Sequence, residues 1–556
     1  PRFGSIFPST PEGITTIDSR FGENITISYK EAIQLCLRAA PQSRVDPKNA
    51  PLAIWLNGGP GASSTAQALG ENGPCIVGDD SNSTTLNPWS WNNEQIFESC
   101  TLKVDFLTGL YIDQPVQVGF SNDTLANAPL MLYQNSTFFV ETFPSLNSNA
   151  TANSTGNAAP AIWSFLQAWL LDFPMYNSRR NELSIWAESY GGHWGPGAAS
   201  YIEQQNNKIS ADELEGAAVI TLDTVGIING GIDFNITAAS YPDMAYNNTY
   251  GFQAITEAEY QSAMTNFTTC TALVDECQKT SAMYDPQNYG NNASVNTACS
   301  TAYGYCALYV EYVFLNSGHD SFDIGHTTPD PTPTKYEIGF LNQPWVQQAL
   351  GVPLNFTYQN MVVYNAVMAE SDITRGGFLD MLGAFLDRGV QVVLMYGDRD
   401  YIGNWIAGER SSLAINSSLS SNFAEAGYAN ISTNATYDGG VVRQYGNLSF
   451  SRVFDAAHGV PYYQPETAYR IFNRAMPHVD IATGRHLDIG NYSTSGPSSS
   501  FQYKNIMPED PKKVCYTLMV LTTCTAADIQ RLASETAIVK DFVVVGYLDG
   551  NVTIYY

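Results

Sequence analysis

Apolar runs of strand length alternate with amphipathic stretches along most of the chain. Five of these runs are bounded by glycine or polar residues, as buried strands usually are; they cover residues 51–57, 104–114, 182–188, 217–229 and 389–397. Two stretches between them, 161–173 and 381–388, repeat apolar residues at helical spacing. The alternation predicts an α/β fold with a mostly parallel central sheet and helices on both faces.

Polar corners follow three of the predicted strands, after Leu56, Ala187 and Tyr396. The carboxyl ends of parallel strands meet at one edge of a sheet, and ligands bind there. We therefore expect the functional residues of the chain in these three corners.

Two segments break the alternation. Residues 233–335 are rich in Asn, Tyr and Thr and end in a proline-rich stretch at 327–333, which predicts a cap inserted into the catalytic domain. The core would then comprise residues 1–232 and 336–482. Residues 483–556 are expected to form a C-terminal extension that packs on the core, with a helix at 526–534 and a terminal hairpin.

Charge and hydropathy exclude several classes of protein. The 556 residues carry a formal net charge of −27, and the pI of about 4.4 gives no basic patch for nucleic acid. No run of eighteen apolar residues exists, so a membrane span is not expected. The chain begins Pro1-Arg2 without Met, which is typical of a processed mature terminus. An acidic pI suits a protein that works in an acidic medium.

Nine cysteines indicate an oxidising compartment. A nested pairing, Cys270–Cys306 with Cys277–Cys299, would staple a two-helix or hairpin flap, although spacing cannot fix the connectivity. Zinc binding is the weaker alternative, because neither a tight C-x2-C pair nor a local His accompanies these cysteines. Further plausible pairs are Cys75–Cys100 and Cys515–Cys524, which leaves Cys36 as a buried thiol.

The chain is also dense in N-x-S/T triplets, the acceptor sequence for N-linked glycans. The candidate asparagines are Asn24, Asn82, Asn122, Asn135, Asn149, Asn153, Asn235, Asn247, Asn266, Asn292, Asn355, Asn416, Asn430, Asn434, Asn447, Asn491 and Asn551. Their density predicts a glycoprotein of the secretory pathway, either secreted or vacuolar.

Ser189 lies at the end of the predicted strand at 182–188 and before a helix. Its neighbours at positions −2 and +2, Ala187 and Gly191, are small, as a sharp strand-to-helix turn requires. Such an elbow exposes the serine hydroxyl and aims backbone N–H groups at a developing negative charge. A serine is a nucleophile only if a base and an oxyanion site surround it, so Ser189 alone is weak evidence.

Six histidines are available as the base. His193 follows the elbow by four residues and would point along the helix, so we expect a structural role. His458 lies in a loop of small residues after an apparent strand at 449–454, and it follows an acid along the chain, as the base does in hydrolases of this kind. The acid is Asp398 or Asp400, and pattern alone does not choose between them.

A glycine-rich loop, Asn57-Gly58-Gly59-Pro60-Gly61, follows the first predicted strand. Glycines let backbone N–H groups approach a ligand closely, so the loop could supply half of an oxyanion hole. Taken alone, the loop is equally typical of an ordinary glycine turn.

Together these motifs resemble the serine carboxypeptidase family, in its secreted fungal branch. The resemblance covers roughly residues 8–476, and its motifs occur in the family order; they are residues 56–64, 111–116 with 119–121, 188–192, 228–230, 341–346, 397–405 and 457–465. It implies an α/β-hydrolase fold with an inserted cap, and a serine exopeptidase that removes C-terminal residues of peptides and proteins through an acyl-enzyme at acidic pH. It implies no cofactor, no metal and no nucleic-acid or membrane partner.

The resemblance assigns roles by matching position. The triad would be Ser189, Asp400 and His458, and the oxyanion donors would be the backbone N–H groups of Gly59 and Tyr190. The residues that hold the terminal carboxylate of the substrate would be Asn57, Glu188 and the Gly58 N–H, with Glu71 bonded to Glu188. A carboxylate is repelled by ionised acids, so binding would require shared protons on the two glutamates and would weaken as they ionise.

The chain departs from the family pattern at three positions. Ala62 stands where the loop of the family usually carries cysteine, so a disulfide that anchors the loop at 57–64 is not expected. Gly403 stands at a position near the base that is often cysteine. Gly459 replaces a bulky residue after the histidine, which predicts broad acceptance of large C-terminal side chains. The alternatives to a carboxypeptidase are an acyltransferase or esterase on the same scaffold, and a catalytically silent binding protein.

Overall fold

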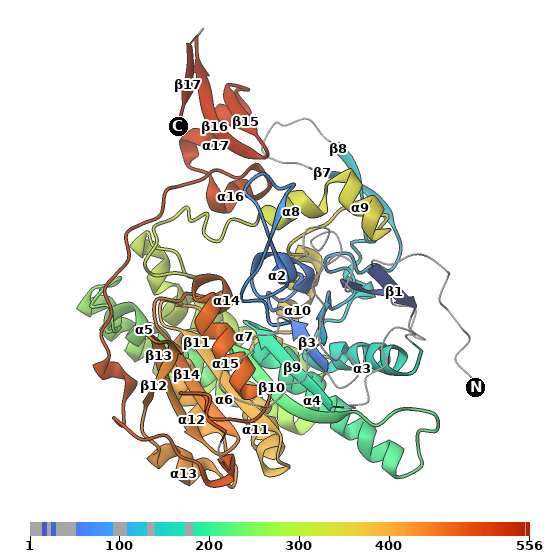
Figure 1. Cartoon of the computed structure of the whole chain (residues 1–556), viewed down its shortest axis with the longest axis vertical. Helices are drawn as coiled ribbons and strands as arrows, with labels where there is room; N and C mark the ends of the chain where they lie inside the picture. Colours follow the sequence, from blue (N-terminus) through green and yellow to red (C-terminus); the bar gives the residue numbers. More distant parts are fainter. Residues whose placement is uncertain are drawn as a thin grey trace.

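The computed structural model describes residues 14–18, 24–28, 52–92, 108–130, 139–172, 182–486, 488–550 and 552–556. A ten-stranded sheet runs through the molecule in the order β1-β2-β6-β3-β9-β10-β11-β14-β13-β12 (Figure 1). Its strands are β1 (Ile14–Asp18), β2 (Asn24–Ser28), β3 (Leu52–Leu56), β6 (Thr108–Ile112), β9 (Glu182–Glu188), β10 (Thr221–Ile228), β11 (Gln391–Gly397), β12 (Ala429–Asn434), β13 (Tyr437–Tyr445) and β14 (Leu448–Val453).

The six central strands, β6, β3, β9, β10, β11 and β14, pair in parallel, and the outer strands pair antiparallel at both edges. The five predicted strands correspond to β3, β6, β9, β10 and β11, and residues 104–107 lie outside the described part of the chain. The mostly parallel sheet of the predicted α/β fold is therefore confirmed. The antiparallel strands β12 and β13 were not predicted; their polar, glycine-containing sequences give a weak strand signal.

Alternating side chains of the central strands enter two separate cores, because a strand presents successive residues to opposite faces. Ile54 of β3 belongs to a core that also contains residues of α3 (Thr155–Asp172), α4 (Gly191–Ser210), α11 (Phe378–Asp387) and α12 (Trp405–Ala414). Trp55, the next residue, packs on the opposite face with α15 (Pro465–Ala475). Helices thus cover both faces of the sheet.

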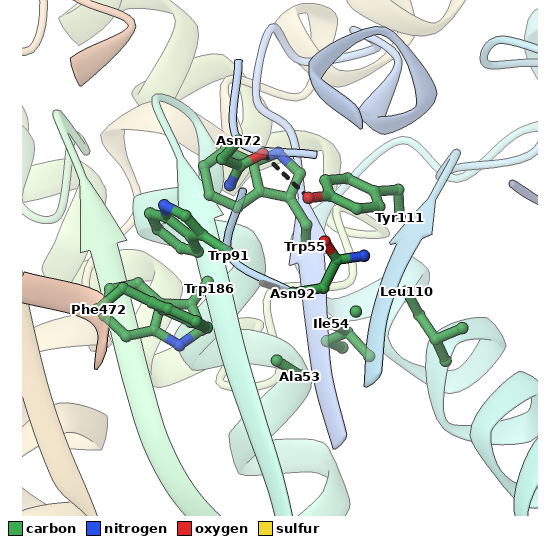
Figure 2. A pocket seen from close by; sticks show the side chains of 11 residues that line it. Ala53, Ile54, Trp55, Asn72, Trp91, Asn92, Leu110, Tyr111, Trp186 and Phe472 are labelled. Carbon is green, nitrogen blue, oxygen red and sulfur yellow. Dashed lines mark hydrogen bonds between the residues drawn. The ribbon is translucent and has the colours of Figure 1, made fainter. Parts of the chain in front are cut away.

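Aromatic rings fill much of the second face (Figure 2). Trp91 stacks on Phe472 of α15 with ring centroids 4.1 Å apart, and it meets the edges of Trp55 and Trp186 at 5.3 and 5.1 Å. Through Trp91, this cluster packs α15, which follows the His458 loop, against β3 and against β9, the strand that leads to Ser189. The packing thereby sets the position of α15 relative to these two strands.

Residues 233–335 contribute the helices α5 (Phe234–Tyr246), α6 (Glu257–Tyr284) and α7 (Ala293–Cys306). Disulfides join Cys270 to Cys306 and Cys277 to Cys299, so α6 and α7 form a stapled helix pair, and these thiols are not available as zinc ligands. Both pairings agree with the sequence-based prediction.

The C-terminal segment forms a small three-stranded sheet, β15 (Ala537–Lys540), β16 (Val543–Asp549) and β17 (Val552–Tyr555), at one end of the long axis (Figure 1). The expected Cys515–Cys524 disulfide lies beneath it. Tyr516 anchors the segment, because its hydroxyl lies 3.0 Å from Ser81 Oγ and accepts the Gly339 N–H. Cys75 is disulfide-bonded, whereas its expected partner Cys100, and Cys36, lie outside the described residues.

Candidate active site

Ser189 lies at a sharp turn between β9 and α4. Its φ of +63° is a left-handed conformation that a residue with a Cβ rarely adopts. The turn leaves no room around it: a Cβ on Gly191 would lie 2.7 Å from the Cβ of Ala187, and one on Gly192 would lie 2.2 Å from the carbonyl oxygen of Gly231. The two glycines therefore permit the elbow that presents the Ser189 hydroxyl.

Asp400 and His458 meet after the ends of β11 and β14. The Nδ1 atom of His458 lies 2.7 Å from Oδ2 of Asp400. The same carboxylate accepts the side-chain amide of Asn229 at 2.7 Å and the backbone N–H groups of Ile402 and Gly403 at 3.0 and 3.1 Å. Four donors and full burial fix this carboxylate, as an acid that orients a histidine requires.

Asp398, the competing acid, lies in a different network. It accepts bonds from the Tyr250 hydroxyl at 2.6 Å, the Asn505 amide at 2.8 Å and the Arg452 guanidinium at 3.1 Å. Burial outweighs these attractive contacts and raises the pKa of Asp398 to about 6. The structure therefore brings Asp400, and not Asp398, to the histidine.

The glycine-rich loop packs directly on the elbow. A Cβ on Gly58 would lie 2.4 Å from the Tyr190 nitrogen and 2.6 Å from the Ser189 Cβ, so only glycine fits there. Asp113 holds the loop from below, because its carboxylate accepts the Ser63 hydroxyl at 2.6 Å and the Thr65 N–H at 3.0 Å. Within the described residues, no hydrogen bond engages the N–H groups of Gly59 and Tyr190, which leaves them available to a ligand.

Two buried glutamates lie beside the nucleophile. Glu188 precedes Ser189, Glu71 ends α2 (Ser64–Gly70), and the two side chains interact. Each retains one buried carboxyl oxygen without a hydrogen-bond partner in the described structure. Burial, assisted by repulsion from Glu71, raises the pKa of Glu188 well above its usual range; burial also raises the pKa of Glu71, against the attraction of Lys335.

Asn57 borders the same site. Its Nδ2 donates to the Ser63 carbonyl at 2.9 Å, and its Oδ1 accepts the Gly58 N–H at 2.7 Å. An amide NH₂ carries two protons, so one N–H of Asn57 stays available for a ligand. The Gly58 N–H, in contrast, would have to leave the Asn57 oxygen before it could bind a carboxylate.

A pocket of about 510 Å³ opens beside Ser189. Besides Gly59 and Tyr190, its lining is mostly apolar. Phe234 and Tyr241 come from the 233–335 segment, and Ile373 and Ile402 come from later in the chain. Asn229 also lines it, so this residue connects the Ser189 pocket to the Asp400–His458 pair.

Asp372 supports the pocket from behind. It accepts the Tyr190 hydroxyl at 2.6 Å and the Thr155 hydroxyl at 2.5 Å, and the His193 ring lies 3.5 Å away. Burial alone would raise the pKa of Asp372, but the contacts with His193, Thr155 and Tyr190 outweigh it and hold the pKa below its usual range. His193 therefore faces Asp372 and the pocket, and we find no role for it as the base.

Sequence reasoning missed Asp372 and Lys335 and gave Asn229 no role. Asn229 follows β10 at the carboxyl edge of the sheet, which was a usable signal. Lys335 lies in a loop and Asp372 begins a short 3-10 helix (Asp372–Thr374), and no sequence pattern marks either residue.

Every candidate glycosylation asparagine whose side chain is described is exposed or half-buried. The side chains of Asn24, Asn135 and Asn551 are outside the described part. Among the helices that the structure describes, none combines the length and apolar character needed to cross a bilayer.

Comparisons with known proteins agree with this geometry. Residues 39–478 match the serine carboxypeptidase family. The chain is 43% identical to carboxypeptidase S1 homolog B of Arthroderma otae, over 98% of this chain and 90% of the relative. It is 32% identical to carboxypeptidase S1 of Penicillium janthinellum, over 80% and 92%.

Among solved structures, the prohormone-processing carboxypeptidase Kex1(Δ)p of Saccharomyces cerevisiae superposes with a TM-score of 0.63 at 20% identity, covering 87% of this chain and 94% of that one. This likeness supports the α/β-hydrolase fold. The fold, the arrangement of the site and the extent of the sequence match show that the chain belongs to the serine carboxypeptidase family.

Proposed function

We propose that this serine carboxypeptidase uses Ser189, His458 and Asp400 to hydrolyse the last peptide bond of peptides and proteins. His458 takes the proton of the Ser189 hydroxyl while Oγ bonds to the scissile carbonyl carbon. The N–H groups of Gly59 and Tyr190 then bind the oxyanion, and each such donor contributes roughly 3 kcal/mol. Asp400, held by Asn229, Ile402 and Gly403, keeps the imidazole oriented.

The second half of the reaction returns the enzyme to its starting state. His458 gives its proton to the nitrogen of the leaving residue, the C–N bond breaks, and an ester remains on Ser189. A water molecule, deprotonated by His458, attacks that ester; the bond to Ser189 Oγ breaks, His458 returns its proton to Oγ, and the shortened peptide leaves with a new carboxylate.

The observation that carries exopeptidase activity is the glutamate pair. Glu71 and Glu188 are buried beside the nucleophile with unpartnered oxygens, a costly arrangement unless a ligand uses it. When protonated, they donate to the terminal carboxylate together with Asn57 and Gly58, which places the last peptide bond at Ser189. An esterase or acyltransferase would have no use for this pair.

The raised pKa values also set the working range. In acid the glutamates are protonated and donate; at higher pH they ionise and repel the terminal carboxylate. We therefore propose activity at acidic pH, which fits the pI of about 4.4 and a secreted or vacuolar glycoprotein. Residues 233–335 would act as the cap that shapes the pocket beside Ser189.

Hydrolysis of an N-blocked dipeptide at pH 4.5, compared with the same dipeptide amidated at its C-terminus, tests the proposal. We expect the free acid to be hydrolysed and amidation to lower kcat/KM by at least about a hundredfold. Ser189→Ala should abolish both turnover and labelling by a fluorophosphonate. Equal turnover of the two dipeptides would refute the exopeptidase assignment, and labelling of the Ser189→Ala variant would refute the nucleophile.

A further inference from the structure

Lys335 brings a cation into the carboxylate-binding site. It is the residue before α8 (Tyr336–Leu341), and its Nζ lies 3.9 Å from Oε1 of Glu71. The side chain is 16% exposed, so it is mostly buried yet open on one side. The Nζ atom of Lys335 also lies over the ring of Tyr358, 5.0 Å from the ring centroid. Within the described residues no hydrogen bond engages this ammonium, which leaves its three N–H donors for a ligand.

The position of Lys335 relative to His458 shows which part of a substrate it would meet. Gly459 follows His458, and a Cβ on Gly459 would lie 3.1 Å from the same Glu71 oxygen that Lys335 approaches. Gly459 and Lys335 therefore lie on the same carboxyl oxygen of Glu71, beside the paired glutamates. With the terminal carboxylate on Glu188, we infer that the side chain of the leaving residue lies near this oxygen.

The groups around Lys335 are acidic but buried. Glu71, Glu188, Glu337, Tyr358 and Tyr462 face it, and His458 lies near Glu71. Burial raises the pKa of Glu337 to about 7, and burial raises the pKa values of Glu71 and Glu188 as well. Lys335 keeps its proton, because attraction to these neighbours outweighs burial and raises its pKa. Lys335 is therefore the cation of a cluster of acidic groups whose own ionised forms burial disfavours.

We propose that Lys335 makes this enzyme selective for peptides whose C-terminal residue is acidic, because its ammonium pairs with the side-chain carboxylate of the leaving residue. The inference rests on the proposed function, since it assumes that the terminal carboxylate binds at Glu188. A C-terminal Lys or Arg would be repelled by the same charge.

Hydrolysis of three N-blocked dipeptides, ending in Phe-Glu, Phe-Gln and Phe-Lys, tests the selectivity at pH 5.5. A Glu side chain is ionised at this pH, and Gln has the same shape without the charge. We expect kcat/KM to be about tenfold higher for Phe-Glu than for Phe-Gln, as one charge-assisted contact would give, and lowest for Phe-Lys.

Lys335→Met should bring the Phe-Glu to Phe-Gln ratio close to one, and Lys335→Arg should keep it above about threefold. Lys540→Met removes an exposed lysine of β15 and should leave the ratio unchanged. Fluorophosphonate labelling of Ser189 confirms that each variant is folded. A wild-type ratio near one, or a ratio that survives Lys335→Met, would overturn the inference while leaving the proposed function intact. If none of the three dipeptides were hydrolysed, the proposed function itself would be refuted.

Discussion

Asn229 donates from Nδ2 to Oδ2 of Asp400 over 2.7 Å, the same carboxyl oxygen that lies 2.7 Å from His458 Nδ1. Its Oδ1 accepts the Gly397 N–H at 2.9 Å, so the amide is held at both ends. Asn229 is thus a positioning residue that acts on the histidine through Asp400.

Asn229→Ala should lower kcat by about tenfold, on the order of 1.4 kcal/mol, because Asp400 loses one of its four donors. Asn505→Ala removes a comparable amide bond to Asp398, 2.8 Å long, and serves as the matched control. Equal kcat values for the two variants would contradict the positioning role.

Gly58→Ala should reduce kcat/KM by about a hundredfold or more, because the new Cβ would lie 2.4 Å from the Tyr190 nitrogen and displace an oxyanion donor. Steady-state kinetics with a blocked dipeptide measures the loss. Gly304→Ala, on α7, adds a methyl group with no atom within 4 Å and should be neutral. Wild-type turnover in the Gly58→Ala variant would show that the loop does not form the oxyanion site.

Glu188→Gln should flatten the pH dependence of peptide binding. In the wild-type enzyme KM should rise with pH, because the proton that lets Glu188 donate to the substrate is lost as pH passes its raised pKa. A glutamine amide donates at every pH, so KM in the variant should vary little from pH 4 to 8. The test is KM for a blocked dipeptide across this range, with Glu257→Gln at the exposed start of α6 as control. An unchanged KM profile would remove Glu188 from carboxylate binding.

Gly459→Leu should narrow the pocket for the leaving residue. The wild-type enzyme is expected to accept C-terminal Phe and Leu at least as well as Ala, because Gly459 contributes no side chain. In the variant, the first added carbon already lies 3.1 Å from Glu71, so kcat/KM for Phe should fall about tenfold relative to Ala. A wild-type enzyme that strongly prefers Ala and Gly over Phe would contradict this account.

The stability of the fold should decrease from pH 4.5 to pH 7.5. Burial raises the pKa of Glu311 to about 7, so the folded state holds a proton that the unfolded state has already released. The proton on Glu311 stabilises the fold fully below the pKa that Glu311 has in the unfolded state. This stabilisation is lost as pH rises through about 7, which lowers the free energy of unfolding by about 3 kcal/mol. Denaturation midpoints in urea at the two pH values should differ less in Glu311→Gln than in wild type. An identical pH dependence would disprove the contribution of Glu311.

Features that depend on neighbouring residues in the chain could be predicted from the sequence, whereas contacts between distant residues could not. The strands at 182–188 and 389–397 and the elbow at Ser189 were predictable, because buried runs and small flanking residues act on their own backbone. The nested disulfides agree with the pairing suggested from the cysteine cluster, although spacing alone left their connectivity open.

The sequence by itself therefore determined the alternating elements, the elbow at Ser189 and the glycine loop. Its local pattern left Asp398 and Asp400 open, and only the resemblance selected Asp400; the tertiary structure brings Asp400 to His458, and it alone brought in Asn229, Asp372 and Lys335. Asn229 and Asp400 are 171 residues apart along the chain, and Tyr190 and Asp372 are 182 apart. Contacts of this kind leave no periodicity in the sequence, because the carboxyl edge of the sheet gathers residues whose local surroundings are unrelated.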